Sequence, residues 1–389
     1  MSAPHVMILA GEVSGDAHAA EFVEVLRQRR PDIQVSGMGG AAMKRAGVEV
    51  FFDSSIIAVV GLVEIIRHWG DIKRAMAIVR ERMTNTRPDL LVLVDYPEFN
   101  LKMAQHARAL GIRVLFYISP QVWAWREHRV HKIARLVDHM AVIFEFEKKY
   151  YQDAGLPVSF VGHPLVDKVR CSADRDSLRA DLDIAADKRV VGLFPGSRRS
   201  EISRLLPVLL ETAKRMHARE PNLCFLMPVA SELDFEAISA EARAAGVDIR
   251  VSRDNIYDVI ACCDAIASCS GTVTLEIALL EVPMCVVYKV SSLSYLILRR
   301  LVRIAHIGLV NIVAQRSVAR ELLQSEANAK NIAAELFEIL GNDDYRARIR
   351  DGLRQVRQNL GSGNGAENMA ELVLSLLPET AQADAPLER

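Results

Sequence analysis

The stretch VMILAGEVSGD (residues 6–16) decides the fold, because an apolar run of strand length leads directly into a glycine-containing turn. Such a run followed by a turn and a helical pattern is typical of the first β–α unit of an α/β protein. A glycine turn at this place usually holds a phosphate, but Glu12 and Asp16 would repel one at short range. The turn also lacks the GxGxxG spacing. We therefore predict a hydroxyl-binding loop formed by Glu12, Ser14 and Asp16, the alternative being that Ser14 or Asp16 only caps the helix.

Further short apolar runs alternate with helical patterns along the chain. They lie at 33–37, 48–52, 90–95, 114–119 and 140–144, and then at 190–196, 224–230, 248–252, 265–268 and 284–289. Apolar strands separated by helices indicate parallel sheets buried on both faces. The pattern pauses at FVGHPLVDKVRCSADRDS (160–177), which is a candidate hinge. The sequence thus predicts an α/β protein of two doubly wound, Rossmann-like domains facing a cleft.

The hinge sets the expected domain boundaries. We expect an N-terminal domain at 1–164 and a C-terminal domain at 165–342. Residues 343–378 read as one or two helices that pack back across the cleft, and 379–389 as a frayed tail.

Composition narrows the function classes. The 389 residues include 48 Lys and Arg against 49 Asp and Glu, so no basic field points to nucleic acid. The six cysteines contain no CxxC pair and are interpreted as reduced core residues of a cytosolic protein. The N-terminus lacks the features of a signal peptide, and we expect no membrane-spanning helix.

The loop after the run at 190–196 has the character of an anion site. Gly196 allows close backbone approach, Ser197 can cap a helix whose free N–H groups favour anions, and Arg198 can pair with phosphate oxygens. The alternative is an ordinary capped turn.

A second loop follows the run at 265–268. Ser270, Gly271 and Thr272 would open the next helix, and Glu276 lies one turn further, where a carboxylate can accept from ribose hydroxyls. The alternative for Glu276 is a solvated helix residue. Together, the two loops predict a nucleotide bound by the C-terminal half.

The first half carries a candidate general base. Asp95 ends an otherwise apolar strand, where an unpaired carboxylate is costly to bury and its pKa is adjustable. The alternative is a carboxylate that braces the next helix, a role also open to Glu98 and Asn100. After the next strand, Gln121 and Trp123 suit a sugar or a lipid, or belong to a packed loop.

Metal binding is not indicated. The DLD at 181–183 lies on the wrong end of its strand, and His128 and His131 lack a third ligand. Two other segments, 54–83 and 291–305, mix apolar runs with basic residues, as interfacial helices on anionic lipid do. The alternative is that both segments are amphipathic helices packed on the core.

Several motifs together resemble those of the lipid-A-disaccharide synthase family, bacterial glycosyltransferases of the two-domain GT-B type. They are AGEVSGD, VDYPEFN, SPQVWAWR, FVGHP, LFPGSR, SGTVTLE and NIVAQRSVARELLQ, in order between about residues 5 and 375. The family joins UDP-2,3-diacylglucosamine to 2,3-diacylglucosamine 1-phosphate through a β-1,6 bond, inverts the anomeric centre and releases UDP.

The resemblance implies a role for each candidate residue. Asp95 would take the proton of the acceptor hydroxyl, and Arg198 with Gly196 and Ser197 would stabilise the departing diphosphate. Glu276 would hold the ribose, and Ser270, Gly271, Thr272 and Asn311 would lie on the nucleotide side. Glu12, Ser14 and Asp16, with Asn100, Gln121 and Trp123, complete the expected substrate-binding set.

The resemblance further implies that the enzyme needs no cofactor. It also implies a cytoplasmic enzyme that binds peripherally to the inner face of the inner membrane and contacts anionic lipid. The oligomeric state stays open. Two alternatives are an isomerase of the same architecture, like UDP-N-acetylglucosamine 2-epimerase, and a non-catalytic nucleotide-sugar-binding protein. The epimerase would place its acid and base residues beside C2 of the sugar, and the binding protein would tolerate loss of Asp95.

Overall fold

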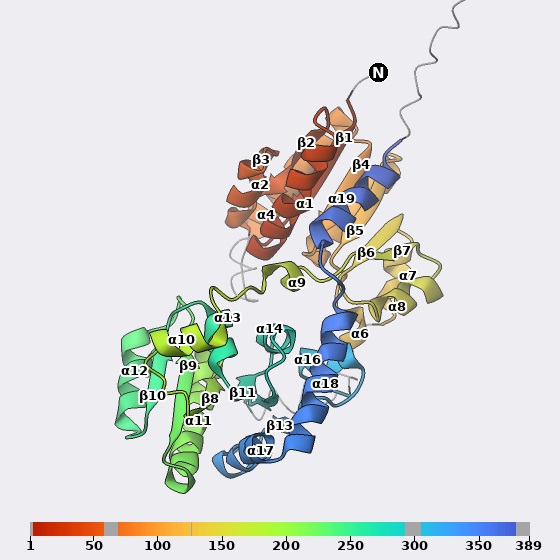
Figure 1. The fold of residues 1–389 in the computed structure, drawn as a ribbon. Coiled ribbons are helices and arrows are strands. Elements are labelled where there is room, and N and C mark those ends of the chain that lie inside the picture. The colour runs from red at the N-terminus through yellow and green to blue at the C-terminus, as the bar shows by residue number, and fades with distance from the viewer. Residues whose placement is uncertain (1–2, 58–68, 126, 292–304, 379–389) are drawn as a thin grey trace, which may run out of the picture. The chain divides into compact units, whose positions relative to one another are not determined.

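The computed structural model describes residues 3–57, 69–125, 127–291 and 305–378. The chain divides into two compact units, Met1–Pro164 with Gly363–Arg389, and Leu165–Ser362. Each unit contains a parallel sheet with helices between its strands (Figure 1). The expected class of two doubly wound α/β domains is therefore confirmed.

The first unit has a seven-stranded sheet in the order β3-β2-β1-β4-β5-β6-β7. Its strands are β1 His5–Ala10, β2 Gln34–Gly39, β3 Glu49–Asp53, β4 Leu90–Val94, β5 Arg113–Tyr117, β6 His139–Val142 and β7 Val158–Phe160. Its described helices are α1 Val13–Arg29, α2 Ala41–Arg45, η1 Ser54–Ile56, α4 Trp69–Thr86, α5 Pro97–Ala109, α6 Val122–Trp125, α7 Arg129–Ala134, α8 Glu147–Asp153 and α19 Gly365–Leu376.

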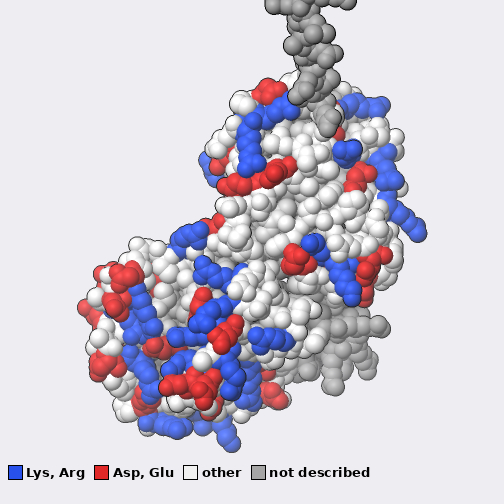
Figure 2. Space-filling model, turned by 45° about the vertical axis from the view of Figure 1, so that its right-hand side comes forward, with Lys and Arg blue, Asp and Glu red and all other residues white. Residues whose placement is uncertain are grey.

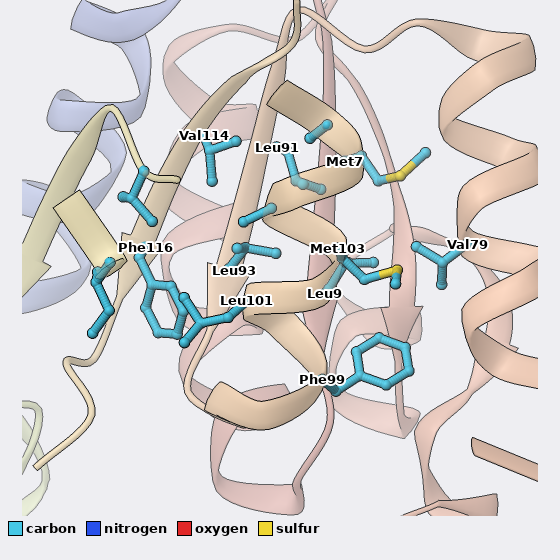
Figure 3. Packing of buried hydrophobic residues seen from close by; sticks show 14 of the residues in the cluster. Met7, Leu9, Val79, Leu91, Leu93, Phe99, Leu101, Met103, Val114 and Phe116 are labelled. Carbon is cyan, nitrogen blue, oxygen red and sulfur yellow. The ribbon is translucent and has the colours of Figure 1, made fainter. Parts of the chain in front are cut away.

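Alternating strand residues build a core on each face of this sheet. On one face, Met7, Leu9 and Leu93 pack against Phe99 and Met103 of α5 (Figure 3). Their neighbours in the strands point to the other face, because successive side chains of a strand alternate. There they meet α1 and α19. Both faces are thus buried, which explains why the strands read as continuous apolar runs.

The second unit has a six-stranded parallel sheet in the order β10-β9-β8-β11-β12-β13. Its strands are β8 Arg189–Phe194, β9 Leu223–Pro228, β10 Ile249–Ser252, β11 Ala265–Cys269, β12 Met284–Tyr288 and β13 Glu321–Leu323. Its described helices are α9 Leu165–Lys168, α10 Arg175–Asp181, α11 Arg199–Arg219, α12 Phe235–Ala244, α13 Ile256–Cys262, α14 Val273–Leu279, α16 Leu309–Ala314, α17 Ala329–Gly341 and α18 Asp343–Asn359.

The C-terminal segment contains two helices that belong to different units. The helix α18 packs against α14, α16 and α17 of the second unit, whereas α19 packs on α1 of the first. Met369 and Val373 bury the apolar face of α19 in the first unit's core, and the Asn368 amide donates to the Val161 carbonyl at 3.0 Å.

The edge strands β7 and β13 are not among the apolar runs expected to be strands. Each has only three residues. A segment this short shows no periodicity, and it becomes a strand only because a neighbouring strand offers it backbone partners. Its assignment therefore depends on tertiary pairing.

The surface carries both signs of charge. Acidic and basic side chains are interspersed on the face shown in Figure 2, in line with the near-zero net charge. Five cysteines are buried and Cys171 is half-buried, and all six are free thiols. Within the described ranges, every helix is too short or too polar to cross a membrane.

Candidate functional site

Strands β1 and β4 lie side by side in the first sheet, with Ala10 paired to Val94. The strand order reverses here, since β2 continues on one side and β5 on the other. In open α/β sheets, ligands bind outside the carboxyl ends of the strands at such a switch point. The loops beginning at Gly11 and Asp95 therefore form the candidate site of the first unit.

The turn after β4 has an unusual backbone. Asp95 and Tyr96 both lie in the left-handed region, with φ of +48° and +47°. This region costs a residue with a Cβ roughly 1–2 kcal/mol. The Tyr96 ring packs on Gly11, where an added Cβ would lie 2.2 Å from ring atom Cδ1. The two loops thus hold each other in place, and strain of this kind is found where surrounding structure enforces it, often at functional sites.

The Asp95 carboxyl is partly buried beside a pocket of about 260 Å³. The pocket is lined by Asp95, Pro97, Ile118, Ser119, Pro120, Gln121, Val122 and Arg129. Burial raises the pKa of Asp95, while the Tyr96 N–H and the nearby His18 act in the opposite direction. A carboxylate whose pKa is moved toward neutrality is a better proton acceptor, so this geometry suits a general base.

Glu12 lies near Asp95 at the same edge of the sheet. Burial raises the pKa of Glu12, and the charge of Asp95 raises it further. Ser14 is exposed on the first turn of α1. The N-cap residue of α1 is Glu12, and its side chain makes no capping bond. Ser14 and Asp16 lie inside the helix, so neither of them is the cap.

Asp16 has an internal role. Its buried carboxylate accepts from the N–H groups of Gly40 (2.6 Å), Ala42 (2.9 Å) and Met43 (3.1 Å), at the N-terminus of α2. These bonds engage both oxygens. The structure therefore makes Asp16 a support for the next loop, and its expected contact with a substrate hydroxyl stays a prediction.

Asn100 is also engaged inside the protein. Its side chain is fully buried, and Nδ2 donates to the carbonyls of Val94 (3.2 Å) and Asp95 (2.7 Å). Asn100 thus holds the strained turn that presents Asp95, while its Oδ1 has no hydrogen-bond partner among the described residues. Its expected contact with substrate stays a prediction.

Trp123 packs over a buried carboxyl. Its indole N–H donates to Glu147 Oε1 at 3.1 Å, and its ring lies edge-on to Phe146 at 5.5 Å. Beside them, the Ser119 and Tyr151 hydroxyls are 2.6 Å apart. Trp123 is therefore largely part of the packed loop, while Gln121 is exposed at the pocket.

Glu147 makes stability depend on pH. Burial raises its pKa from 4.5 to about 8. As pH rises between these values, the unfolded chain ionises first, so the free energy of unfolding falls. We expect Glu147→Gln, which keeps the acceptor for Trp123, to match wild type near pH 5 and to melt higher above pH 8. Each kcal/mol corresponds to about 2–4 °C in a domain of this size.

Melting temperatures of both proteins from pH 5 to 9 check this expectation. Glu145→Gln is the matched control, because Glu145 is half exposed and pairs with Lys148 at 2.9 Å. Parallel curves for wild type and Glu147→Gln would contradict it.

In the second unit, β8 and β11 lie side by side, and the strand order again reverses between them. The loops after these strands line one pocket of about 560 Å³. The expected residues that it brings together are Gly196, Ser197, Arg198, Ser270, Gly271, Thr272 and Glu276. Pairing of the two strands thus joins two loops that are more than 70 residues apart in the sequence.

The groups in this pocket differ in character. The Arg198 side chain is 79% exposed, and its Nη1 lies 3.2 Å from Glu201 Oε1. Burial raises the pKa of Glu276, which is hydrogen-bonded to Tyr257. The Ser270 hydroxyl donates to the Ile307 carbonyl at 3.0 Å. The pocket thus holds an arginine side chain at one part and a carboxylate acceptor at another, two kinds of group that bind a nucleoside diphosphate.

Asn311 does not line this pocket. It is fully buried, and its Nδ2 donates to the Ala319 carbonyl (2.7 Å) and to Glu321 Oε1 (2.8 Å). Its Oδ1 accepts from the N–H groups of Val318 (2.8 Å) and Ala319 (2.9 Å). With these bonds made inside the protein, Asn311 organises the chain before β13, and its expected place on the nucleotide side stays a prediction.

Some site residues were not anticipated from the sequence. Arg129 lines the first pocket, and Glu201 and Arg253 line the second. Only Glu201 had a local signal, because it stands three residues after the helix N-cap Arg198, the spacing of a capping box. Arg129 and Arg253 lie outside the expected motifs and reach their pockets through tertiary packing.

Comparisons with known proteins agree with this arrangement. Residues 6–375 match the family model described as lipid-A-disaccharide synthetase. The lipid-A-disaccharide synthase of Geobacter metallireducens is 51% identical over 372 residues, covering 96% of this chain and 97% of that protein.

Solved structures are similar at the level of the fold. A UDP-GlcNAc 2-epimerase from Neisseria meningitidis bound to UDP-GlcNAc has a TM-score of 0.63 at 12% identity, covering 95% of this chain and all of that one. The glycotransferase of kitacinnamycin has a TM-score of 0.62 at 16% identity, covering 97% of this chain and all of that one. Both likenesses show the two-domain fold alone. The near full-length sequence match goes further, and on it the chain belongs to the lipid-A-disaccharide synthase family.

Proposed function

We propose that this protein transfers a 2,3-diacylglucosamine unit from UDP to 2,3-diacylglucosamine 1-phosphate, forming a β-1,6-linked disaccharide and releasing UDP. The proposal rests on two facts together: the chain belongs to this family, and its two candidate sites carry the groups that such a transfer needs. One switch point presents a partly buried carboxyl, and the other presents Arg198 and Glu276 in a nucleotide-sized pocket.

In this mechanism the first unit supplies the base. The Asp95 carboxylate takes the proton of the acceptor 6-hydroxyl as its oxygen forms a bond to C1 of the donor sugar. The bond between C1 and the phosphate oxygen breaks from the opposite side, so the anomeric centre inverts. Burial favours this step, because it raises the pKa of Asp95 and so makes the carboxylate a stronger base.

The second unit stabilises the leaving group. UDP departs with the electron pair of the broken bond, and negative charge grows on its diphosphate. In our proposal the Arg198 guanidinium and the backbone N–H groups of Ser197 and Arg198 receive that charge, and both residues line the pocket. Donors of this kind act most strongly where charge develops. Glu276 would hold the ribose hydroxyls, and Glu12 and Gln121 would contact the acceptor.

The test is direct. The protein is incubated with a UDP-2,3-diacylglucosamine and 2,3-diacylglucosamine 1-phosphate, and the lipid products are analysed by mass spectrometry. A disaccharide phosphate is expected. Recovery of a C2 epimer of the donor would instead support the isomerase alternative, and unchanged substrates would support a binding protein.

We also propose peripheral binding to anionic lipid on the cytoplasmic side of the inner membrane. Of the two basic–apolar segments, 58–68 and 292–304 lie outside the described residues. Described residues at the carboxyl edge of the first sheet support the proposal. Val13, Ile56 and Trp69 expose large apolar side chains, and the amines of Lys73 and Lys102 lie 5.7 and 5.6 Å from the centre of the Trp69 ring.

Vesicle flotation tests this surface. We expect the protein to float with anionic vesicles at low salt, because apolar side chains insert and lysines meet lipid phosphates. Trp69→Ser with Lys73→Ser should lower the bound fraction several-fold. Lys330→Ser, an exposed position in the second unit, is the control. Equal flotation of both variants would count against this surface, and no flotation of wild type would remove the proposal.

A further inference from the structure

The N-terminal turn of α11 already holds an anion from its own chain. Glu201 Oε2 accepts from the backbone N–H groups of Ser197 at 3.0 Å and Arg198 at 3.1 Å. Its other oxygen, Oε1, lies 3.2 Å from Nη1 of Arg198. These are the backbone and side-chain donors proposed above for the diphosphate. A carboxylate of the protein therefore stands where a phosphate would bind.

The loop is shaped around this carboxylate. Gly196 has φ of +106°, and a Cβ added to it would lie 2.4 Å from Glu201 Oε2 and 2.8 Å from Glu201 Cβ. Glycine is thus needed here for the close approach of Glu201 as well as for the backbone angle. The Glu201 side chain is 20% exposed and lines the nucleotide pocket, so it has open space into which it can turn.

A diphosphate and this carboxylate cannot share the donors. Each N–H makes one strong hydrogen bond, and two anions at that separation repel each other more strongly in a half-buried site than in water. Binding of UDP must therefore either move Glu201 away or forgo those N–H groups. The alternative is that Glu201 only holds Arg198 in the orientation that binds phosphate, in which case its loss would weaken binding.

We propose that Glu201 is an internal stand-in anion, which occupies the diphosphate donors while the site is empty and is displaced when the nucleotide binds. The proposal rests on the function proposed above, because it takes the ligand to be a nucleoside diphosphate. Displacement opposes binding, so Glu201 lowers the affinity for UDP. When UDP leaves, the carboxylate closes onto the same donors, which keeps them satisfied and favours product release.

The experiment is a calorimetric titration of the full-length protein with UDP and with uridine. Glu201→Gln keeps a side-chain acceptor for the helix N-terminus but removes the charge, and Glu201→Ala removes the competitor altogether. We expect both variants to bind UDP about tenfold more tightly than wild type, with the larger gain at low salt. Uridine, which has no phosphate, should bind all three proteins equally.

Glu211→Gln is the matched control, because Glu211 lies on the same helix and pairs with Arg215 at 3.3 Å on its exposed face. It should leave the dissociation constant for UDP unchanged, and melting temperatures check that every variant is folded. Steady-state assays should show stronger product inhibition by UDP in Glu201→Gln. UDP binding that is unchanged or weaker in both folded variants would overturn the proposal.

The two proposals fail in different ways. If wild type makes no disaccharide but Glu201→Gln still binds UDP more tightly, the transferase function falls and the stand-in anion remains. If wild type makes the disaccharide and the variants bind UDP no more tightly, only the role of Glu201 falls.

Discussion

Replacement of Asp95 with asparagine is expected to lower kcat for disaccharide formation by about 10²–10⁴-fold, the usual contribution of a general base. Asparagine has nearly the same shape but cannot take a proton at neutral pH. It also tolerates the left-handed backbone that Asp95 adopts, with φ of +48°, so the turn should fold normally. UDP binds to the other unit in our proposal, and its dissociation constant should stay at the wild-type value.

The pH dependence gives this prediction a second readout. Because burial raises the pKa of Asp95, kcat/KM of wild type should fall on the acid side as the carboxyl becomes protonated. That acid limb should disappear from the residual activity of Asp95→Asn. Asp32→Asn, at an exposed surface position, serves as the control and should behave like wild type. Near-normal turnover by Asp95→Asn would refute its role as base.

Replacement of Arg198 with alanine is expected to weaken UDP binding and lower kcat together. The guanidinium is an exposed cation of the nucleotide pocket, which Arg253 also lines, and charge-assisted hydrogen bonds of this type are stronger than neutral ones. Loss of one donor to a developing anion typically costs about 10²–10³ in kcat. The effect on UDP should be increased by Glu201, whose carboxylate would then face the diphosphate without its ion-pair partner.

Two further variants separate charge from geometry. Arg198→Lys keeps the positive charge but cannot donate two parallel hydrogen bonds, so its activity should fall between those of wild type and Arg198→Ala. Arg199→Ala removes the neighbouring exposed arginine, which does not line the described pocket, and should have little effect. UDP affinity and kcat of Arg198→Ala equal to those of wild type would exclude the phosphate role.

Much of the candidate site could be predicted from local sequence. The apolar runs that became β1, β4, β8 and β11 were evident, and the residues directly after them include Asp95 and Arg198. Ligand-binding residues of open α/β folds gather at the carboxyl ends of strands, so their location follows once the strands are known. The sequence also separated a carboxylate-bearing loop in one unit from an arginine-bearing loop in the other.

The roles of Asp16, Asn100 and Asn311 could not be predicted in this way. Each is a buried polar side chain in a candidate motif: Asp16 bonds to the N-terminus of α2, Asn100 to the turn before its own helix and to Leu9 of β1, and Asn311 to the chain before β13. A buried polar group must find hydrogen-bond partners, and whether these are ligand or protein is decided by which loops pack nearby. The position of a residue in a motif therefore does not show whether its side chain supports a loop or contacts a ligand.

The sequence by itself determined where most strands and helices form and which charge each loop carries, because hydrophobic periodicity and turn chemistry act within a few residues. Only the tertiary structure decided that β1 lies beside β4 and β8 beside β11, since strand order depends on packing between segments far apart in the chain. Those pairings bring Tyr96 onto Gly11 and join the Arg198 and Glu276 loops in one pocket. The Glu201 contact is local: its capping-box spacing from Arg198 is present in the sequence, and the structure shows the carboxylate on the donors proposed for the diphosphate.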